Sequence, residues 1–437
     1  MNFLTSATNT IKSWFGLKAA AEQKAQAELA LRQRIGGGAL SFYEGSAPKQ
    51  LVVKPGQPDD NVFVNYPQTI VDKGVAFLFG DELKISIGTD EDQRGEEYLE
   101  RVWPADQRAE DLIDAATDGG IFGDAYLKIR INELGEPEVL TLDPNNMTVE
   151  TDPDDYRRAL KYVCQYDYTD ERGATVKYRE ETVFEDGRWI VRELESRDQM
   201  RFVQMSEDKV WSYSFAPIFH CKNLPFSKSY YGKPDLTKSV LALCAYLSRL
   251  DSIIGKIVRV HSSPKPWARG LQKQDLQMGV DDVLFLGANS EAMLGLLEMK
   301  GDLAGAIAFR KQLRECLAEI SHIPEIAASK TENLGQLSGR ALKILYGPLI
   351  DQTKKKQRLY GAMIKRVIAA LLEIGSFKDL EVKVQWADPI PSDPKEEAEV
   401  ALLQRQFGVS EDTLQKQRGF DPKHEREMNK LSIKDSD

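Results

Sequence analysis

The sequence predicts an α+β protein of 437 residues, with a strand-rich stretch in its first half and helices in its second half. Alternating apolar and polar residues recur in five runs separated by turn sequences, which is the pattern of an antiparallel meander. The runs are Ala125–Ile131, Glu138–Leu142, Ala159–Tyr168, Thr175–Phe184 and Trp189–Leu194. From residue 236 onward, apolar residues recur at helical spacing instead. Strands followed by helices indicate the α+β class.

Composition is that of an ordinary globular protein, with 42% hydrophobic and 29% charged residues, and the length suffices for two to four structural units. No run approaches the roughly 20 apolar residues of a membrane span, and no basic segment followed by an apolar core marks a secretory signal. The four cysteines are far apart and form no C-x-x-C, so neither a disulfide framework nor a zinc site is expected. We therefore expect a reducing, cytoplasmic setting and no membrane partner.

The net charge of −10 argues against a protein that holds nucleic acid tightly, because phosphate neutralisation needs clustered Lys and Arg. It is compatible with a wall past which DNA slides.

Before the strand-rich stretch the sequence predicts three helices and one strand. Residues 1–35 are expected to be helical and to stop at Gly36–Gly38, docking on the protein's own body or on a neighbour. A buried helix from Tyr66 should end at Gly80, followed by a strand at 83–87. A helix over 96–117 should end at Gly119–Gly120.

A regular apolar seam follows residue 235. Its members, spaced 4-3-4-3-4-3, are Leu236, Val240, Leu243, Leu247, Leu250, Ile254 and Ile257. Such a heptad seam requires partner helices. We expect copies of the chain to supply them, so the seam predicts a stem interface in a helical ring or bundle.

The remaining helices enclose two irregular segments. Short apolar runs interrupt the helices over 264–299, a second helix covers 303–320, and a loop covers 323–337. A long helix begins near 338, is kinked by Pro348 and ends at Gly375. The tail from 394 is polar, charged and helical.

No catalytic or cofactor motif is present. The four histidines are isolated, and no H-E-x-x-H, G-x-S-x-G or G-x-G-x-x-G occurs. Acidic clusters at Asp90–Asp92, Asp152–Asp155 and Asp281–Asp282 are read as solvated turns, with a magnesium or calcium site as the alternative. The basic run Lys354–Arg358 contacts DNA or an acidic neighbour, or is a solvated helix face.

Three groups of residues resemble the portal proteins (head–tail connectors) of tailed double-stranded-DNA bacteriophages. The first group is Phe42–Gly45 followed by Ile70–Asp72 and Phe79–Gly80. The second is Gly232–Leu236 leading into the seam helix, with Ser338–Leu342 opening the later helix. The third is the tail, with Asp388–Ile390, Glu396–Ala398, Gly408–Ser410 and Asp421–Pro422. Their order and spacing cover nearly the whole chain.

The resemblance implies a portal-type fold assembled as a ring, usually of twelve subunits. The implied parts are an N-terminal arm (1–35), a mixed α/β wing (36–232), a stem helix (233–262), a small β-containing clip (263–301), a second stem helix (302–322), a tunnel loop (323–337), a kinked helix and strand returning to the wing (338–390), and a helical crown (391–437).

The implied function is mechanical. The ring would sit at one capsid vertex of the virion, after assembly in the host cytoplasm, and DNA would be packaged and ejected through its axial channel. The implied partners are the terminase large subunit, the major capsid and scaffolding proteins, a head-completion or tail adaptor, and double-stranded DNA held weakly and without sequence specificity. No catalytic residue, cofactor or metal is expected.

Two segments carry the expected contacts. The clip would dock the motor and the adaptor through Asp281, Asp282, Val283 and Phe285. The tunnel loop would face DNA with small or polar side chains that nearly cancel in charge, namely Ser329, Lys330, Thr331, Glu332, Asn333 and Gln336.

Two alternatives remain open from the residues alone. One is a capsid-associated scaffold or adaptor without a channel, which imaging of the assembly would distinguish. The other is a carboxylate-metal nuclease, which magnesium-dependent DNA cleavage would reveal.

Overall fold

The computed structural model describes residues 27–80, 83–88, 93–197, 201–262, 265–269, 293–297, 303–324, 339–377 and 380–388, and short pieces of 402–414. These residues belong to two compact units. The first comprises residues up to 329 together with 348–387, and the second comprises 330–347 and 388–437. Helices and strands are mixed as the α+β prediction requires.

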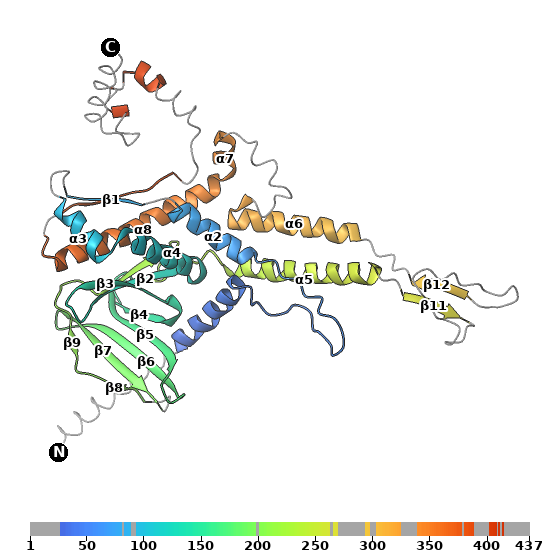
Figure 1. The fold of residues 1–437 in the computed structure, drawn as a ribbon, viewed down its shortest axis with the longest axis horizontal. Coiled ribbons are helices and arrows are strands. Elements are labelled where there is room, and N and C mark those ends of the chain that lie inside the picture. The colour runs from blue at the N-terminus through green and yellow to red at the C-terminus, as the bar shows by residue number, and fades with distance from the viewer. Residues whose placement is uncertain are drawn as a thin grey trace, which may run out of the picture. The chain divides into compact units, whose positions relative to one another are not determined.

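Among the described residues, the first unit contains most of the helices and all of the strands (Figure 1). Its helices are the segment 27–43, α2 (Tyr66–Phe79), α3 (Arg94–Val102), α4 (Ala105–Phe122), α5 (Lys238–Ser262), α6 (Leu303–Ser321) and α8 (Gly347–Ile374), with a 3₁₀ turn η1 (Pro144–Asn146). Its strands are β1 (Lys84–Ile87), β2 (Asp124–Ile131), β3 (Pro137–Leu142), β4 (Met147–Thr151), β5 (Ala159–Thr169), β6 (Thr175–Glu185), β7 (Arg188–Ser196), β8 (Val203–Gln204), β9 (Lys209–Val210), β10 (Ile218–Lys222), β11 (Lys265–Arg269), β12 (Met293–Leu297) and β13 (Val382–Gln385).

All five expected runs form strands, but they do not form one meander. Strand β2 pairs with β10 on one side and with β3 on the other in a three-stranded antiparallel sheet, while β4 to β8 form a separate meander with β9 added to β7. The turn η1 separates the two sheets, and the Asp143 carboxylate accepts a hydrogen bond from the Asn145 amide at its start. The pairing of β10 with β2 joins residues nearly a hundred positions apart, which local alternation does not reveal.

The helix ends expected at Gly36–Gly38 and at Gly119–Gly120 are wrong, because both helices continue through these glycines. Gly36 and Gly120 instead allow another element to pack closely. The helix 27–43 runs through Gly36–Gly38, since a Cβ at Gly36 would meet Phe122 at 2.9 Å. The helix expected over 96–117 is two helices, broken at Pro104, and Gly119–Gly120 lie inside α4. A Cβ at Gly120 would meet Val71 of α2 at 2.9 Å. The helix α4 ends instead at Gly123, whose φ of +96° favours glycine.

The later elements follow the prediction closely. Helices α5 and α6 lie side by side (Figure 1), and β11 pairs with β12 between them in the chain. The long helix is interrupted at Tyr346, two residues before Pro348, and α8 ends before Gly375. Strand β13 pairs with β1, with Val382 opposite Ile87.

The second unit is described only in part. It contains α7 (Gly339–Leu345) and a helical segment at 402–406, and Lys343 forms an ion pair with Asp388 at 3.0 Å. In neither unit is any described helix both long and apolar enough to cross a bilayer.

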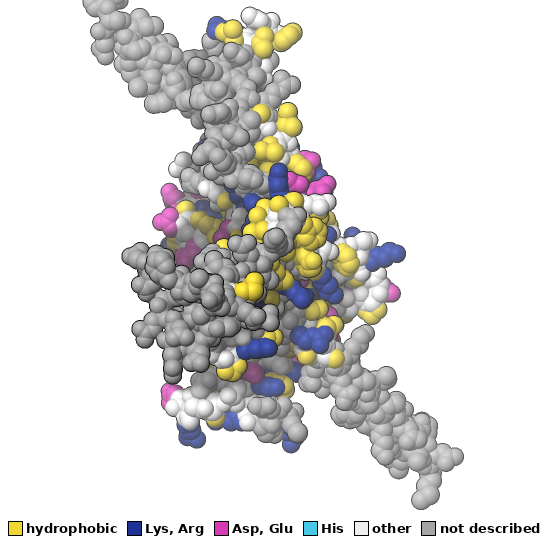
Figure 2. Space-filling model, turned by 90° about the vertical axis from the view of Figure 1, so that its right-hand side faces the viewer, with side chains coloured by type: hydrophobic (Ala, Val, Ile, Leu, Met, Phe, Trp, Pro, Cys, Tyr) yellow, Lys and Arg dark blue, Asp and Glu magenta, His cyan; other side chains and the backbone are white. Residues whose placement is uncertain are grey.

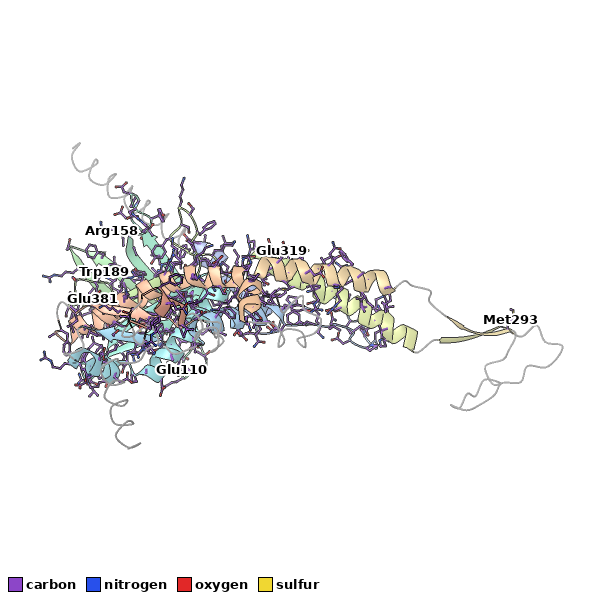
Figure 3. All side chains as sticks on the ribbon, turned by 90° about the horizontal axis from the view of Figure 1, so that it is seen from above. Glu110, Arg158, Trp189, Met293, Glu319 and Glu381 are labelled. Carbon is purple, nitrogen blue, oxygen red and sulfur yellow. The ribbon has the colours of Figure 1, made fainter. Side chains whose placement is uncertain are left out.

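The described surface is mixed in character. Figure 2 shows exposed hydrophobic side chains interspersed with Lys and Arg on one face. Figure 3 shows Glu110 of α4 on one edge of the first unit and Arg158, before β5, on the opposite edge. Different edges of this unit therefore present different helices and strands to a neighbour.

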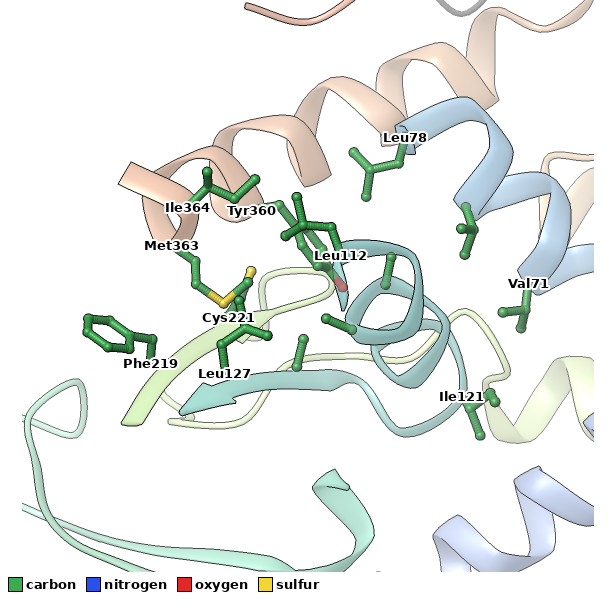
Figure 4. Close-up of a cluster of buried hydrophobic side chains, with 14 of the residues drawn as sticks. Val71, Leu78, Leu112, Ile121, Leu127, Phe219, Cys221, Tyr360, Met363 and Ile364 are labelled. Atoms are coloured by element: carbon green, nitrogen blue, oxygen red, sulfur yellow. The ribbon is translucent and has the colours of Figure 1, made fainter. Parts of the chain in front are cut away.

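The main core lies between α4, α8, α2 and the three-stranded sheet. Leu127 of β2 and Met363 and Ile364 of α8 are fully buried there (Figure 4). Tyr360 of α8 is also fully buried and approaches Asn223. This core fixes α4 and α8 rigidly within the first unit, which positions the outward faces of both helices.

Candidate subunit interface

The base of α5 is anchored by the motif Gly232–Leu236. The Asp235 carboxylate accepts a hydrogen bond from the Lys356 ammonium at 2.5 Å and another from the Gln352 side chain at 2.8 Å. The Asp235 and Lys356 side chains are only 6% and 4% exposed. The Asp235 amide also donates to the Gly120 carbonyl at 2.9 Å. The middle of the basic run therefore belongs to the fold, and it ties α5 to α4 and α8.

A second carboxylate joins the N-terminal helix to the same base. Asp124 is buried, and its Oδ1 accepts hydrogen bonds from the Gly232 amide at 2.7 Å and from His220 Nε2 at 2.8 Å. Its Oδ2 accepts from Arg32 at 3.2 Å, and the Arg32 guanidinium stacks on the Tyr231 ring. Burial lowers the pKa of His220 although Asp124 opposes this. Four segments of the chain thus meet at one buried charge.

The inner half of the predicted seam is buried within the chain itself. Leu236, Val240 and Leu247 are 2%, 2% and 0% exposed and belong to the main core, with Leu243 packed against it. Leu317 of α6 is fully buried in the same cluster. The helices that cover the inner seam thus come from this chain, chiefly α6 and α2. Leu236, Val240 and Leu247 therefore leave no surface for a second copy. The outer members Leu250, Ile254 and Ile257 are half-buried and remain predicted interface residues.

Polar contacts hold the outer part of α5 in place. Asp251 of α5 forms a two-bond ion pair with Arg310 of α6. Ser252 accepts a hydrogen bond from the Val62 amide at 2.9 Å, and Arg259 binds Asp60 at 2.6 and 2.7 Å. The extended segment before α2 therefore covers one side of α5.

Another side of the helix pair exposes apolar side chains, which we call the outer stem stripe. Its members are Tyr246, Ile253, Phe309 and Ile320, which are 38% to 50% exposed. The Tyr246 and Phe309 rings meet edge to face at 6.2 Å, which links the two helices. The sequence carries a second 4-3-4 spacing at residues 246, 250, 253 and 257 that could have indicated this face.

The other expected site residues lie outside the described part of the chain. These are the tunnel-loop residues Ser329, Lys330, Thr331, Glu332, Asn333 and Gln336 and the clip residues Asp281, Asp282, Val283 and Phe285. The clusters at 90–92 and 281–282 lie outside it as well. In the third acidic cluster, Asp152 and Asp155 each face an arginine, Arg158 at 3.6 Å and Arg157 at 2.9 Å. Among the described residues, no three His, Cys, Asp or Glu side chains lie close enough together to hold a metal ion.

Comparison with known proteins identifies the family. A sequence profile described as "Phage portal protein, SPP1 Gp6-like" matches residues 41–430, which is most of the chain. The chain therefore belongs to this family of phage portal proteins, which are structural proteins of virions. No curated protein matches the sequence.

Solved structures from gene transfer agent (GTA) particles match the chain at low sequence identity. The neck of an empty GTA particle, computed with C6 symmetry, matches with a TM-score of 0.50 and 14% identity, covering 82% of this chain and 90% of that chain. The neck of the native GTA particle, computed with C12 symmetry, has a TM-score of 0.47 at 14% identity with the same coverage. A chain of the virion of the native gene transfer agent (GTA) particle matches with a TM-score of 0.47 and 13% identity, covering 88% of this chain and 99% of that chain. The first of these likenesses supports the portal-type fold.

Proposed function

We propose that this chain forms a closed homo-oligomeric ring, of twelve copies as is usual for portals, around an axial channel at one capsid vertex of a virion. The observation that carries this proposal is the portal-family match over residues 41–430. The outer stem stripe supports it, because exposed apolar side chains on a helix pair favour burial against another protein surface.

The parts of the ring follow the family division. We assign the wing to 36–232, the stem to 233–262 and 302–322, the clip to 263–301, the tunnel loop to 323–337 and the crown to 391–437, with 338–390 returning to the wing. The pairing of β13 with β1 supports that return. The helix 27–43 crosses the boundary set at residue 35, so the arm is continuous with the wing at that point.

The channel would admit DNA during packaging and release it on ejection. In this proposal the tunnel loop faces the duplex and binds it weakly. The clip docks the terminase large subunit and later a head-completion or tail adaptor. The major capsid and scaffolding proteins would contact the ring at the vertex, with assembly in the host cytoplasm. The chain contributes no catalysis, since ATP hydrolysis belongs to the motor.

The deciding experiment is imaging of the purified full-length protein by negative-stain electron microscopy, with native mass spectrometry for the copy number. A ring with an open axial hole is expected. A monomer at micromolar concentration, or a particle without a channel, would overturn the proposal and favour a capsid-associated scaffold or adaptor.

Phe309→Glu tests the role of the outer stem stripe. It places a charge on an exposed apolar position of α6, so the folded chain should survive while the ring fraction falls. Lys311→Gln, which makes the same change in net charge at an exposed position on the other side of α6, is the matched control. Equal ring fractions for the two variants would exclude the stripe from the interface.

A further inference from the structure

Helix α8 presents a row of cations on its solvent face, which we call the basic stripe. Lys354, Lys355, Arg358, Lys365 and Arg366 are all exposed, opposite the face buried in the core. None of the five forms an ion pair with a carboxylate among the described residues, and the Arg366 guanidinium donates to the His220 carbonyl at 2.8 Å. No Asp or Glu occurs between Asp351 and Glu373. The charge of this stripe is therefore uncompensated within the described chain.

Helix α4 presents the opposite charge, in a row that we call the acidic stripe. Asp106, Glu110 and Asp114 are exposed at four-residue spacing, and Asp111 and Asp118 lie beside them. No ion pair to Lys or Arg compensates these carboxylates within the described residues. Burial, with smaller contributions from neighbouring carboxylates, raises the pKa of Asp111 and Asp118, so these two favour the uncharged form and the negative charge of the stripe rests on Asp106, Glu110 and Asp114. The acidic stripe is thus a second face that lacks counter-charges.

Such rows are unfavourable in an isolated chain. Like charges four residues apart on a helix repel each other by a few tenths of a kilocalorie per mole for each pair. The repulsion disappears when a surface of the opposite sign covers the row, and charge complementarity of this kind fixes the register between partners. Each stripe therefore indicates a partner of opposite charge.

The acidic stripe is short enough to lie along the basic stripe. The exposed carboxylates from Asp106 to Asp114 span eight residue steps, about 12 Å of helix at 1.5 Å per residue, and the cations from Lys354 to Arg366 span twelve steps, about 18 Å. They lie on two different helices of the first unit. A contact between two different faces of identical chains is heterologous, and such contacts generate rings when the rotation closes.

We propose that the acidic stripe of α4 in one copy binds the basic stripe of α8 in the next copy. This inference rests on the proposed ring and names a pair of faces through which its wing region closes. The exposed apolar residue Ile113 lies within the acidic stripe and supplies a contact that does not depend on charge.

The test uses reversed charges on the full-length chain. An acid-reversed variant carries Asp106→Lys, Glu110→Lys and Asp114→Lys, and a base-reversed variant carries Lys354→Glu, Arg358→Glu and Lys365→Glu. Each should assemble at least about tenfold less than wild type, because like-charge juxtaposition across an interface is strongly disfavoured. Circular dichroism and thermal melting confirm that each variant is folded.

Mixing supplies the decisive result. In an alternating ring of the two variants, every α4 face meets an α8 face of opposite sign, so the 1:1 mixture should restore rings. The chain carrying all six substitutions should also restore them. Two control variants reverse exposed charges elsewhere and should leave assembly unchanged. One carries Glu133→Lys and Glu171→Lys, and the other carries Arg172→Glu and Arg188→Glu.

A crosslinking experiment on wild type remains decisive even if a variant fails to fold. A zero-length carbodiimide reagent should join carboxylates of the acidic stripe to lysines of the basic stripe, between isotopically light and heavy copies mixed before assembly. Crosslinks confined to single copies would contradict the proposal.

The remaining outcomes separate this inference from the proposed function. Wild type that forms no ring contradicts the proposed function. Wild-type rings with unaffected variants, or without rescue on mixing, contradict only the stripe pairing. If the base-reversed variant forms normal rings but loses duplex DNA in a binding assay, the basic stripe is a nucleic-acid face and the pairing is refuted.

Discussion

Replacing Lys356 by methionine should strongly destabilise the first unit. The Lys356 ammonium lies 2.5 Å from Asp235 Oδ2, and the two side chains are 4% and 6% exposed. Lys356→Met retains most of the side-chain volume but leaves the Asp235 carboxylate buried without its cation. The hydrogen bonds from Asn223 and Gln352 reach only Oδ1, so they do not compensate Oδ2.

The size of the effect follows from this burial. Removing one partner of a buried ion pair typically costs about 3–5 kcal/mol, because an uncompensated charge remains in the interior. Lys354→Met, two residues away on the exposed face of α8, is the matched control and should change stability by no more than about 0.5 kcal/mol. The double variant Asp235→Asn with Lys356→Met should recover part of the loss, since it leaves no buried charge.

Urea denaturation followed by circular dichroism measures these differences. All variants are compared under conditions in which each is monomeric, because assembly adds stability by mass action and Lys354 belongs to the proposed basic stripe. Hydrogen exchange should also rise at the start of α5, since Asp235 anchors that helix to α4. If Lys356→Met is no less stable than Lys354→Met, the reasoning about the anchored stem base is refuted.

Leu247→Ala should lower the free energy of unfolding by about 2–5 kcal/mol, because the side chain is fully buried. The protein that remains folded should still assemble. Loss of rings without loss of stability would show that Leu247 belongs to the subunit interface after all. Burial raises the pKa of Asp118 to about 8, from 3.8 for an unperturbed aspartate. The associated stability is fully present below about pH 4 and is lost as the pH rises to 8, so Asp118→Asn should raise the melting temperature at pH 9 and not at pH 4. Asp154→Asn, which is exposed, is the control, and parallel pH profiles for wild type and Asp118→Asn would contradict this prediction. Deleting 329–335 should leave rings intact while packaged DNA becomes shorter or leaks, and normal packaging and retention would exclude the tunnel-loop role.

The sequence alone determined the fold class and most of the elements. Periodicity located α2, the five long strand runs, α5 and α6, because side-chain alternation and helical spacing are local properties. The interruption of the long helix at Tyr346, two residues before Pro348, also has a local cause, the missing amide donor of the proline. The resemblance to portal proteins rested on short motifs such as Gly232–Leu236, and the structure explains that motif as the anchor of α5.

Tertiary structure decided which side of each element meets which partner. The seam from Leu236 to Leu247 has the spacing of an interface between helices, but spacing cannot tell whether the covering helix belongs to the same chain. The sequence predicts helix ends at Gly36 and Gly119–Gly120, because it does not show which glycines are needed for close packing against another element. Lys356 is indistinguishable in sequence from Lys354 and Lys355, and only folding brings Asp235, more than a hundred residues away, to pair with it and leaves the other two facing outward.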